Sequence, residues 1–272
     1  MAKKTLLTIK GKSHSMKKQL ITIGGTYRKV KKVLLTTNGV YKVVFPNFPS
    51  QPSDYELIAT YTEYTVFEAP ENGWYQIELC GASGNGGLSD THDWKYSNDH
   101  YDYRGATGGG GGGGAVAISR VKLNAGDKVI ISPSAVGDTS TVTINTTVEG
   151  ESYAKMTATS GANGTDGQAT PWDGATANEY FVAGTGGIGG TASGGNHANY
   201  NGGEGGNGRK DSMDSDDGYD DSDLNVSGGA GGTAGNANGN TGAKGRDIVE
   251  GRVSTINYGK AGFVNIYAGN TN

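Results

Sequence analysis

Alternating apolar and polar positions dominate the chain from residue 55 onward. Short stretches of period two, bounded by Gly, Asn or Asp, are typical of half-buried β-strands joined by turns. Such stretches cover residues 55–69, 73–81, 115–123, 127–134, 139–148, 152–160 and 261–269. No window has the periodicity of a long amphipathic helix. The pattern predicts an all-β fold, a jelly-roll-like β-sandwich whose first and last strands lie far apart in the sequence.

A fourteen-residue repeat occupies residues 6–45 of the N-terminal region 1–45. Its units are "LLTIKGKSHSMKKQ", "LITIGGTYRKVKKV" and "LLTTNGVYKVVF", with Gly11, Gly25 and Gly39 at equivalent positions. Each unit predicts a small β-hairpin with a glycine-containing turn, and the second run is mostly basic in the first two units. Hairpins this small bury little surface, so we expect this region to dock on copies of itself or on an acidic partner. The alternative is a solvated basic face on a small β-domain.

Glycine accounts for 49 of the 272 residues and falls in tracts at 105–114, 184–208 and 228–245. Collagen would need glycine at every third position with abundant proline, and the chain has only six prolines. A flexible linker is the default alternative, but the tracts contain little serine and interrupt a domain that must close with its last strand. We therefore predict polyglycine-II-type helices, with three residues per turn, packed side by side. Residues 46–54 form a proline-rich linker, and residues 55–272 form the glycine-rich domain.

Charge and hydropathy exclude several classes of protein. The formal net charge is −4, and no basic field covers the whole chain, which argues against nucleic-acid binding. No apolar run approaches the length of a membrane span, and the N-terminus lacks the apolar core of a signal peptide. We expect no membrane insertion, and folding in a cytosol without Sec-type export. Cys80, the single cysteine, lies in an apolar run and is expected to be a buried reduced thiol.

Motifs for cofactors and metals fail on their context. Gly184, Gly186 and Gly189 have the spacing of a dinucleotide-binding fingerprint, but the residues that follow are poor helix formers. His92 and His100 lack the ligand spacing of a metal site. We predict no cofactor and no metal site.

Four segments between the tracts mix aromatic and polar residues, at 88–104, 168–181, 196–200 and 209–225. Loops of this composition, held between rigid elements, resemble antibody binding loops in their chemistry and also suit sugar rings. The candidate receptor contacts are Trp94, Tyr96, Tyr101, Tyr103, Trp172, Tyr180, Tyr200 and Tyr219. The last segment holds seven aspartates outside an EF-hand register, and weak calcium binding there stays open. The alternative for all four is solvated insertions without a partner.

The runs "FEAPENGWYQIELCGASGNGG", "GGGGGGGAVAISRVKLNAGDKVII" and "GKAGFVNIY" resemble glycine-rich β-domains of bacteriophage tail fibres and other extracellular or virion proteins. The repeat ending "KKVLLTTNGVYKVVF" is similar to N-terminal segments of tailed-phage fibre and baseplate-associated proteins. The alternation of tracts with variable segments also resembles adhesins at the fibre tips of T-even-type phages. The chain departs from that adhesin pattern in its β-rich front half and its fourteen-residue repeat.

The resemblance implies a homotrimeric receptor-binding or tail-fibre protein of the virion, assembled in the host cytoplasm. Residues 1–45 would attach to phage baseplate or tail proteins, and the aromatic segments would recognise a host cell-surface polysaccharide or protein. A structural baseplate or fibre component is the alternative. A polysaccharide hydrolase would need paired carboxylates, and nothing in the sequence pairs Glu63, Glu68 and Asp93, so we predict a protein that is not an enzyme.

Overall fold

The computed structural model describes residues 6–9, 12–15, 20–23, 26–29, 33–37, 40–45, 51–97, 100–145, 154–169, 181–215 and 224–269. For 6–45, 94–97, 100–101, 154 and 213–215 this description is of the backbone alone. Strands, turns and extended segments make up these residues, and none of them is helical. The all-β prediction is therefore confirmed. In the same residues no helix is long and apolar enough to cross a membrane.

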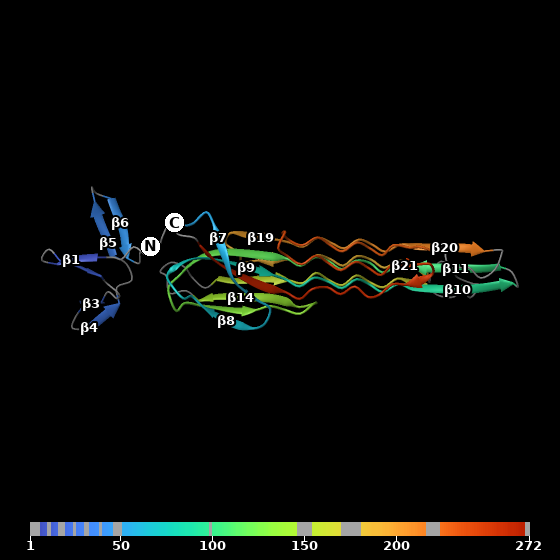
Figure 1. Ribbon diagram of the computed structural model, residues 1–272, viewed down its shortest axis with the longest axis horizontal. Helices are drawn as coiled ribbons and strands as arrows, with labels where there is room; N and C mark the ends of the chain where they lie inside the picture. The colour runs from blue at the N-terminus through green and yellow to red at the C-terminus, as the bar shows by residue number, and fades with distance from the viewer. Residues whose placement is uncertain are drawn as a thin grey trace.

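Two five-stranded antiparallel sheets form a β-sandwich at one end of the glycine-rich domain (Figure 1). The first sheet has the order β19-β12-β9-β23-β7, with bounds Ala198–Tyr200, Val116–Leu123, Gly73–Cys80, Phe263–Gly269 and Tyr55–Tyr61. The second has the order β18-β15-β14-β13-β8, with bounds Ala192–Ser193, Ala154–Thr159, Thr139–Asn145, Lys128–Ser132 and Thr65–Glu68. The domain's first strand pairs with its last, β7 with β23, although they lie far apart in the sequence.

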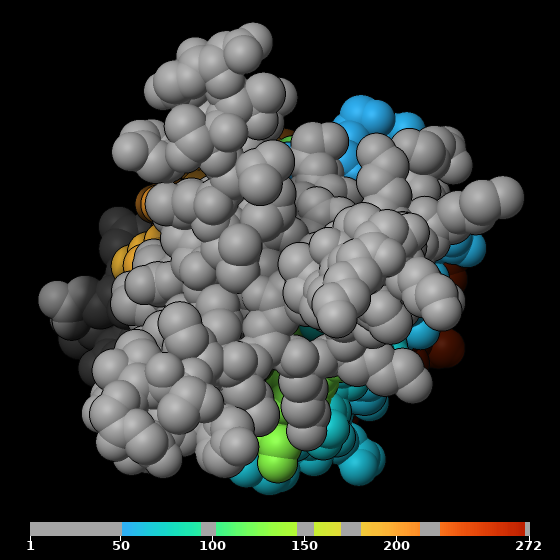
Figure 2. Space-filling view, turned by 90° about the vertical axis from the view of Figure 1, so that its left-hand side faces the viewer, coloured from blue at the N-terminus to red at the C-terminus, as the bar shows by residue number. Residues whose placement is uncertain are grey.

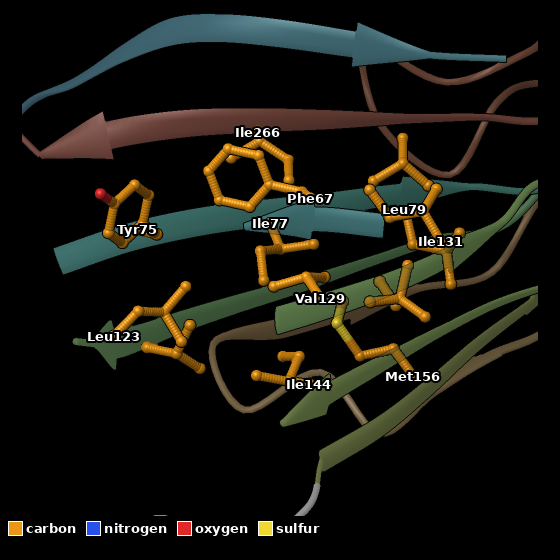
Figure 3. Close-up of a cluster of buried hydrophobic side chains, with 14 of the residues drawn as sticks. Phe67, Tyr75, Ile77, Leu79, Leu123, Val129, Ile131, Ile144, Met156 and Ile266 are labelled. Carbon is orange, nitrogen blue, oxygen red and sulfur yellow. The ribbon is translucent and has the colours of Figure 1, made fainter. Parts of the chain in front are cut away.

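The core lies between the two sheets, where period-two alternation turns one face of each strand inward (Figure 3). Ile77 and Leu79 of β9 are fully buried against residues of the second sheet such as Ile131. Phe67 and Tyr75 meet edge to face, with ring centroids 5.8 Å apart. This packing fixes the register of the strands from which the glycine tracts extend.

A bundle of extended glycine tracts runs from the sandwich to the other end of the domain (Figure 1). The central tract, residues 107–115, is surrounded by six outer tracts at 81–88, 159–167, 183–191, 201–209, 227–235 and 240–246. Three consecutive central N–H groups donate to three outer tracts at 2.8–2.9 Å: Gly109 to the carbonyl of Thr165, Gly110 to that of Gly206 and Gly111 to that of Ala243. Central carbonyls accept from N–H groups of the other three tracts. The Gly109 carbonyl accepts from Gly87, that of Gly110 from Gly187 and that of Gly111 from Gly232.

The bonds recur every three residues, since Gly112 donates again to the tract that Gly109 contacts. Bonds between neighbouring outer tracts close a ring around the central one. A three-residue repeat is that of a polyglycine II helix, which stays our interpretation of the tracts.

Close packing explains the run of seven glycines. A Cβ at Gly108, Gly109 or Gly110 would overlap the backbone of three different outer tracts in turn. No position of the central tract faces solvent, so none of the seven has room for a side chain. Outer tracts also have positions that face away from the central tract, and in residues 159–167 Ala162 and Thr165 are accommodated there and are exposed. The run therefore marks the central tract of the bundle.

Three antiparallel strand pairs lie in the N-terminal repeat. They are β1 (Leu6–Ile9) with β2 (Lys12–Ser15), β3 (Leu20–Ile23) with β4 (Thr26–Lys29), and β5 (Val33–Thr37) with β6 (Val40–Phe45). Equivalent partners recur every fourteen residues, as in Leu6 with Ser15, Leu20 with Lys29 and Leu34 with Val43. The predicted turn glycines Gly11, Gly25 and Gly39, and residues 46–50 of the linker, lie outside the described residues.

Candidate functional site

The chain leaves the bundle four times at the end opposite the sandwich, which we call the distal end (Figure 1). The excursions are residues 89–106, 168–182, 210–226 and 247–253. Thr107 joins three of them where they meet the bundle: its N–H donates to the carbonyl of Arg209 at 2.8 Å, and its hydroxyl donates to the carbonyl of Ser227 at 2.9 Å. Its own carbonyl accepts from Gly184 at 2.9 Å. The described parts of three of the four predicted aromatic segments therefore converge on one end of the bundle.

A three-stranded antiparallel sheet, the distal sheet, forms most of this end. Its order is β10-β11-β20, with bounds Asp90–Ser97, His100–Ala106 and Lys210–Ser215. The prediction of loops at 88–104 and 209–225 was wrong for these strands. Their alternation was hidden by the density of aspartate and aromatic residues, and β11 gains partners on both sides, at Trp94↔Asp102 and Tyr101↔Ser215.

One face of the distal sheet packs on a small apolar cluster. Tyr103 is 2% exposed and is buried with Leu224, Val226 and Ile248. Gly105 permits this contact, because a Cβ there would lie 2.8 Å from the Ile248 side chain. β21 (Ile248–Val249) and β22 (Arg252–Val253) form a short hairpin in the same excursion. The prediction that Tyr103 is an exposed contact residue was therefore wrong, because its side chain belongs to the core of the distal end.

Cationic side chains fix the second excursion against the distal sheet. β16 (Gln168–Ala169) pairs with β17 (Phe181–Val182). The Arg104 guanidinium lies 5.7 Å from the Phe181 ring centroid, and the Lys210 ammonium lies 5.1 Å from it. Lys210 also donates to the Phe181 carbonyl at 2.8 Å, and Arg104 forms an ion pair with Asp102 at 2.8 Å. These contacts tie residues next to Tyr180 to the sheet that carries Trp94.

The other seven predicted contact residues fall into three groups. Trp94 and Tyr96 lie in β10 of the distal sheet, and Tyr101 lies in β11. Tyr200 lies in β19 of the sandwich, paired with Val116, and is 44% exposed. It belongs to the opposite end of the domain, so the structure does not bring it together with the others. Trp172, Tyr180 and Tyr219 lie outside the described residues.

Sequence reasoning missed the residues that position the distal end, above all Thr107, Phe181 and Lys210. Phe181 could have been found from its place directly before a glycine tract, where a large side chain marks the end of the bundle. Thr107 gives no such signal, because its role depends on tracts more than 70 residues away in the sequence.

A buried polar cluster joins the bundle to the sandwich at the other end. Glu78 is 1% exposed and accepts hydrogen bonds from Asn236 at 2.9 Å and from the Tyr267 hydroxyl at 2.8 Å. Asn238 and Asn265 donate to the same carboxylate. Burial, with the hydrogen bond to Glu78, raises the pKa of Tyr267 to about 12. The cluster holds the turn between two outer tracts over the first sheet, and each carboxylate oxygen has donors.

The structure bears on the other sequence-derived candidates as well. Gly184 and Gly186 donate within the bundle, to Thr107 and to the Asn207 side chain, and open no helix as a dinucleotide site requires. Among the described residues no group of three or more His, Cys, Asp and Glu side chains is placed to hold a metal. Cys80 is buried as predicted, and burial raises the pKa of its thiol. Glu63 flanks the sandwich strands β7 and β8, whereas Asp93 lies in the distal sheet, so these two do not form a pair.

No protein-family model matches the chain, and a search of curated proteins finds no relative.

Proposed function

We propose that the protein is a bacteriophage receptor-binding or tail-fibre protein that recognises a host cell-surface receptor through its distal end. The convergence of three aromatic segments on one end of a closed backbone bundle carries the proposal. Separate loops would lose much conformational entropy on binding, but segments anchored at Thr107 and Phe181 are already ordered at their bases. The resemblance to glycine-rich phage fibre domains supports the same function. Residues 1–45 serve as the virion attachment region in this proposal.

Attachment to host cells tests the receptor function. Binding energy at such surfaces concentrates in a few aromatic residues. We expect Trp94→Ala or Trp172→Ala to weaken binding of the purified protein to host cells by about 1–3 kcal/mol. The control is Tyr258→Ala, which removes an aromatic side chain that is 72% exposed beside the bundle and away from the distal end. Melting temperatures measured in parallel distinguish a lost contact from a lost fold.

Two outcomes would contradict the proposal. If the tryptophan variants bind cells normally but fail to enter phage particles, the distal end contacts other virion proteins, and the protein is a structural fibre or baseplate component. If Tyr258→Ala weakens binding as much as Trp94→Ala, the distal end is not the receptor site. Deleting residues 1–45 tests the attachment region separately, because particles should then lack the protein while the truncated chain still binds cells.

A further inference from the structure

The sandwich has one open side, formed by β7 and β8. Among the described residues each is the outermost strand of its sheet, and residues 62–64 join them, so the two edges without a described partner lie together. On the other side the outermost strands, β18 and β19, have two and three residues, whereas β7 has seven. Very short edge strands are one way in which proteins prevent edge-to-edge pairing. β7 lacks this protection, and β8 beside it has four residues.

Apolar side chains extend from this open side into solvent. Leu57 is 51% exposed, Ile58 45%, Tyr64 70% and Val66 44%. Strands β7 and β8 contain neither lysine nor proline, the residues that most often block a sheet edge. In Figure 2, light-blue atoms of the residues just after position 50 reach the surface at the sandwich end. An unpaired edge with exposed apolar residues is the surface that an additional β-strand would cover.

The same side is acidic. Residues 51–73 contain five exposed carboxylates and no Lys or Arg: Asp54, Glu56, Glu63, Glu68 and Glu71. Within the described part of the chain, the ion pairs of the structure involve none of these five. A strand that fits this edge should therefore be basic as well as partly apolar.

The N-terminal repeat has this chemistry. Of the chain's 23 Lys and Arg residues, eleven lie within residues 1–45, which contain no Asp or Glu. Each of its strand pairs is a separate two-stranded sheet. An isolated two-stranded hairpin is at best marginally stable in water, so these strands gain most from a further partner. We propose that the β7–β8 edge binds the basic N-terminal strands, residues 6–45, of a second copy of the chain.

The linker favours a second copy over the same chain. Antiparallel neighbours within one chain are usually joined by two to five residues, but nine residues, 46–54, separate the repeat from β7. Three of these nine are prolines, and this composition favours an extended linker over a tight turn between β6 and β7. Because every copy has both surfaces, a reciprocal exchange covers two edges at once. This inference concerns assembly and does not depend on what the distal end binds.

The molar mass of the full-length chain, measured by analytical ultracentrifugation from about 1 to about 100 µM, tests the proposal. We expect concentration-dependent assembly that weakens at high salt. The double variant Leu57→Lys with Val66→Lys places two like charges opposite the basic strands and should raise the dissociation constant at least about tenfold. The matched control is Val249→Lys, which alters a valine that is 53% exposed in β21 at the distal end and should leave assembly unchanged. A melting temperature confirms that each variant is folded.

Several results would overturn the inference. They are a monomer throughout the concentration range, assembly that the double variant does not change, and an equal effect of the β21 control. If the double variant makes residues 1–45 more sensitive to protease without any change in molar mass, the strands dock on their own chain, which rejects the second copy as the occupant.

Discussion

Tyr103 shows how burial separates two roles that look the same in a sequence. It lies among aromatic and polar residues, and this composition favoured a contact with a receptor. In the structure it is the centre of the apolar cluster beneath the distal sheet, with partners more than 100 residues away in the sequence. The aromatic content of a segment therefore indicates contact area, but the fold determines whether that area faces a receptor or the protein's own core.

Substitution of Tyr103 tests this assignment. We expect Tyr103→Ala to lower the free energy of unfolding by about 3 kcal/mol, because removal of the buried ring leaves a cavity that the sheet cannot close. Tyr103→Phe keeps the ring and should cost much less. Urea denaturation measures both, with the exposed Tyr258→Ala as the control, for which we expect a change within about 0.5 kcal/mol. If Tyr103→Ala is as stable as the control, the ring is not buried in the native protein.

At the scale of the element, the glycine tracts depend on satisfied backbone groups rather than on side-chain packing. The rim of the bundle uses side-chain oxygens where no further tract is available. Asn163 accepts from the N–H of Asn85 at 2.8 Å, and Asp166 accepts from that of Leu88 at 2.7 Å. Asn207 accepts from Gly186 at 2.9 Å. Outward-facing Asn, Asp and Thr thus complete the outer tracts, which explains why those residue types interrupt the glycines.

Side chains introduced into the bundle should be costly. A Cβ at Gly110, Gly187 or Gly231 would overlap the carbonyl of Ala230, Ala162 or Gly242, respectively. These obstacles are backbone atoms that cannot rotate away, so we expect each valine variant to lose about 3 kcal/mol, the upper end of the usual range for overpacking. The control is Ala230→Thr, at an exposed outward position equivalent to Thr233 three residues on. If Gly110→Val has the same melting temperature as this control, the close packing is refuted.

At the scale of the molecule, the tracts connect two small cores that lie far apart. The sandwich core contains Ile131, and the distal core contains Tyr103. The central tract continues directly from β11 of the distal sheet into β12 of the sandwich, and the outer tracts are bonded to it along its length. Strands of both cores therefore continue into hydrogen-bonded tracts of the bundle.

We therefore expect residues 51–269 to unfold in one cooperative transition. Ile131→Ala should lower stability by about 2–5 kcal/mol, and it should shift the same transition as Tyr103→Ala does from the other end. Far-UV circular dichroism and tyrosine fluorescence, recorded during one thermal melt, measure this coupling. Two separate transitions, each sensitive to only one of the variants, would show that the ends fold independently.

Local pattern in the sequence was sufficient for the long strands of the sandwich and for the existence of packed tracts, but it missed the short edge strands β18 and β19. Period-two alternation is a property of neighbouring residues, and for this reason all seven predicted stretches contain a strand. The glycine run at 108–114 was informative for the same reason. Each of its positions lacks room for a side chain, and glycine is the residue without one. The sequence indicated that the domain closes with its last strand, and the structure shows that β7 is the strand paired with β23 at that edge.

Tertiary structure alone decided which segments meet. The described parts of residues 88–104, 168–181 and 209–225 come together because the tracts between them traverse the bundle, whereas residues 196–200 end at the sandwich with Tyr200 in β19. The direction in which each tract crosses the bundle depends on its hydrogen-bonded neighbours, which are distant in the sequence. The burial of Tyr103 by Leu224 and Ile248 has the same origin, since the solvent exposure of a side chain is set by what packs over it and not by the residues beside it in the chain.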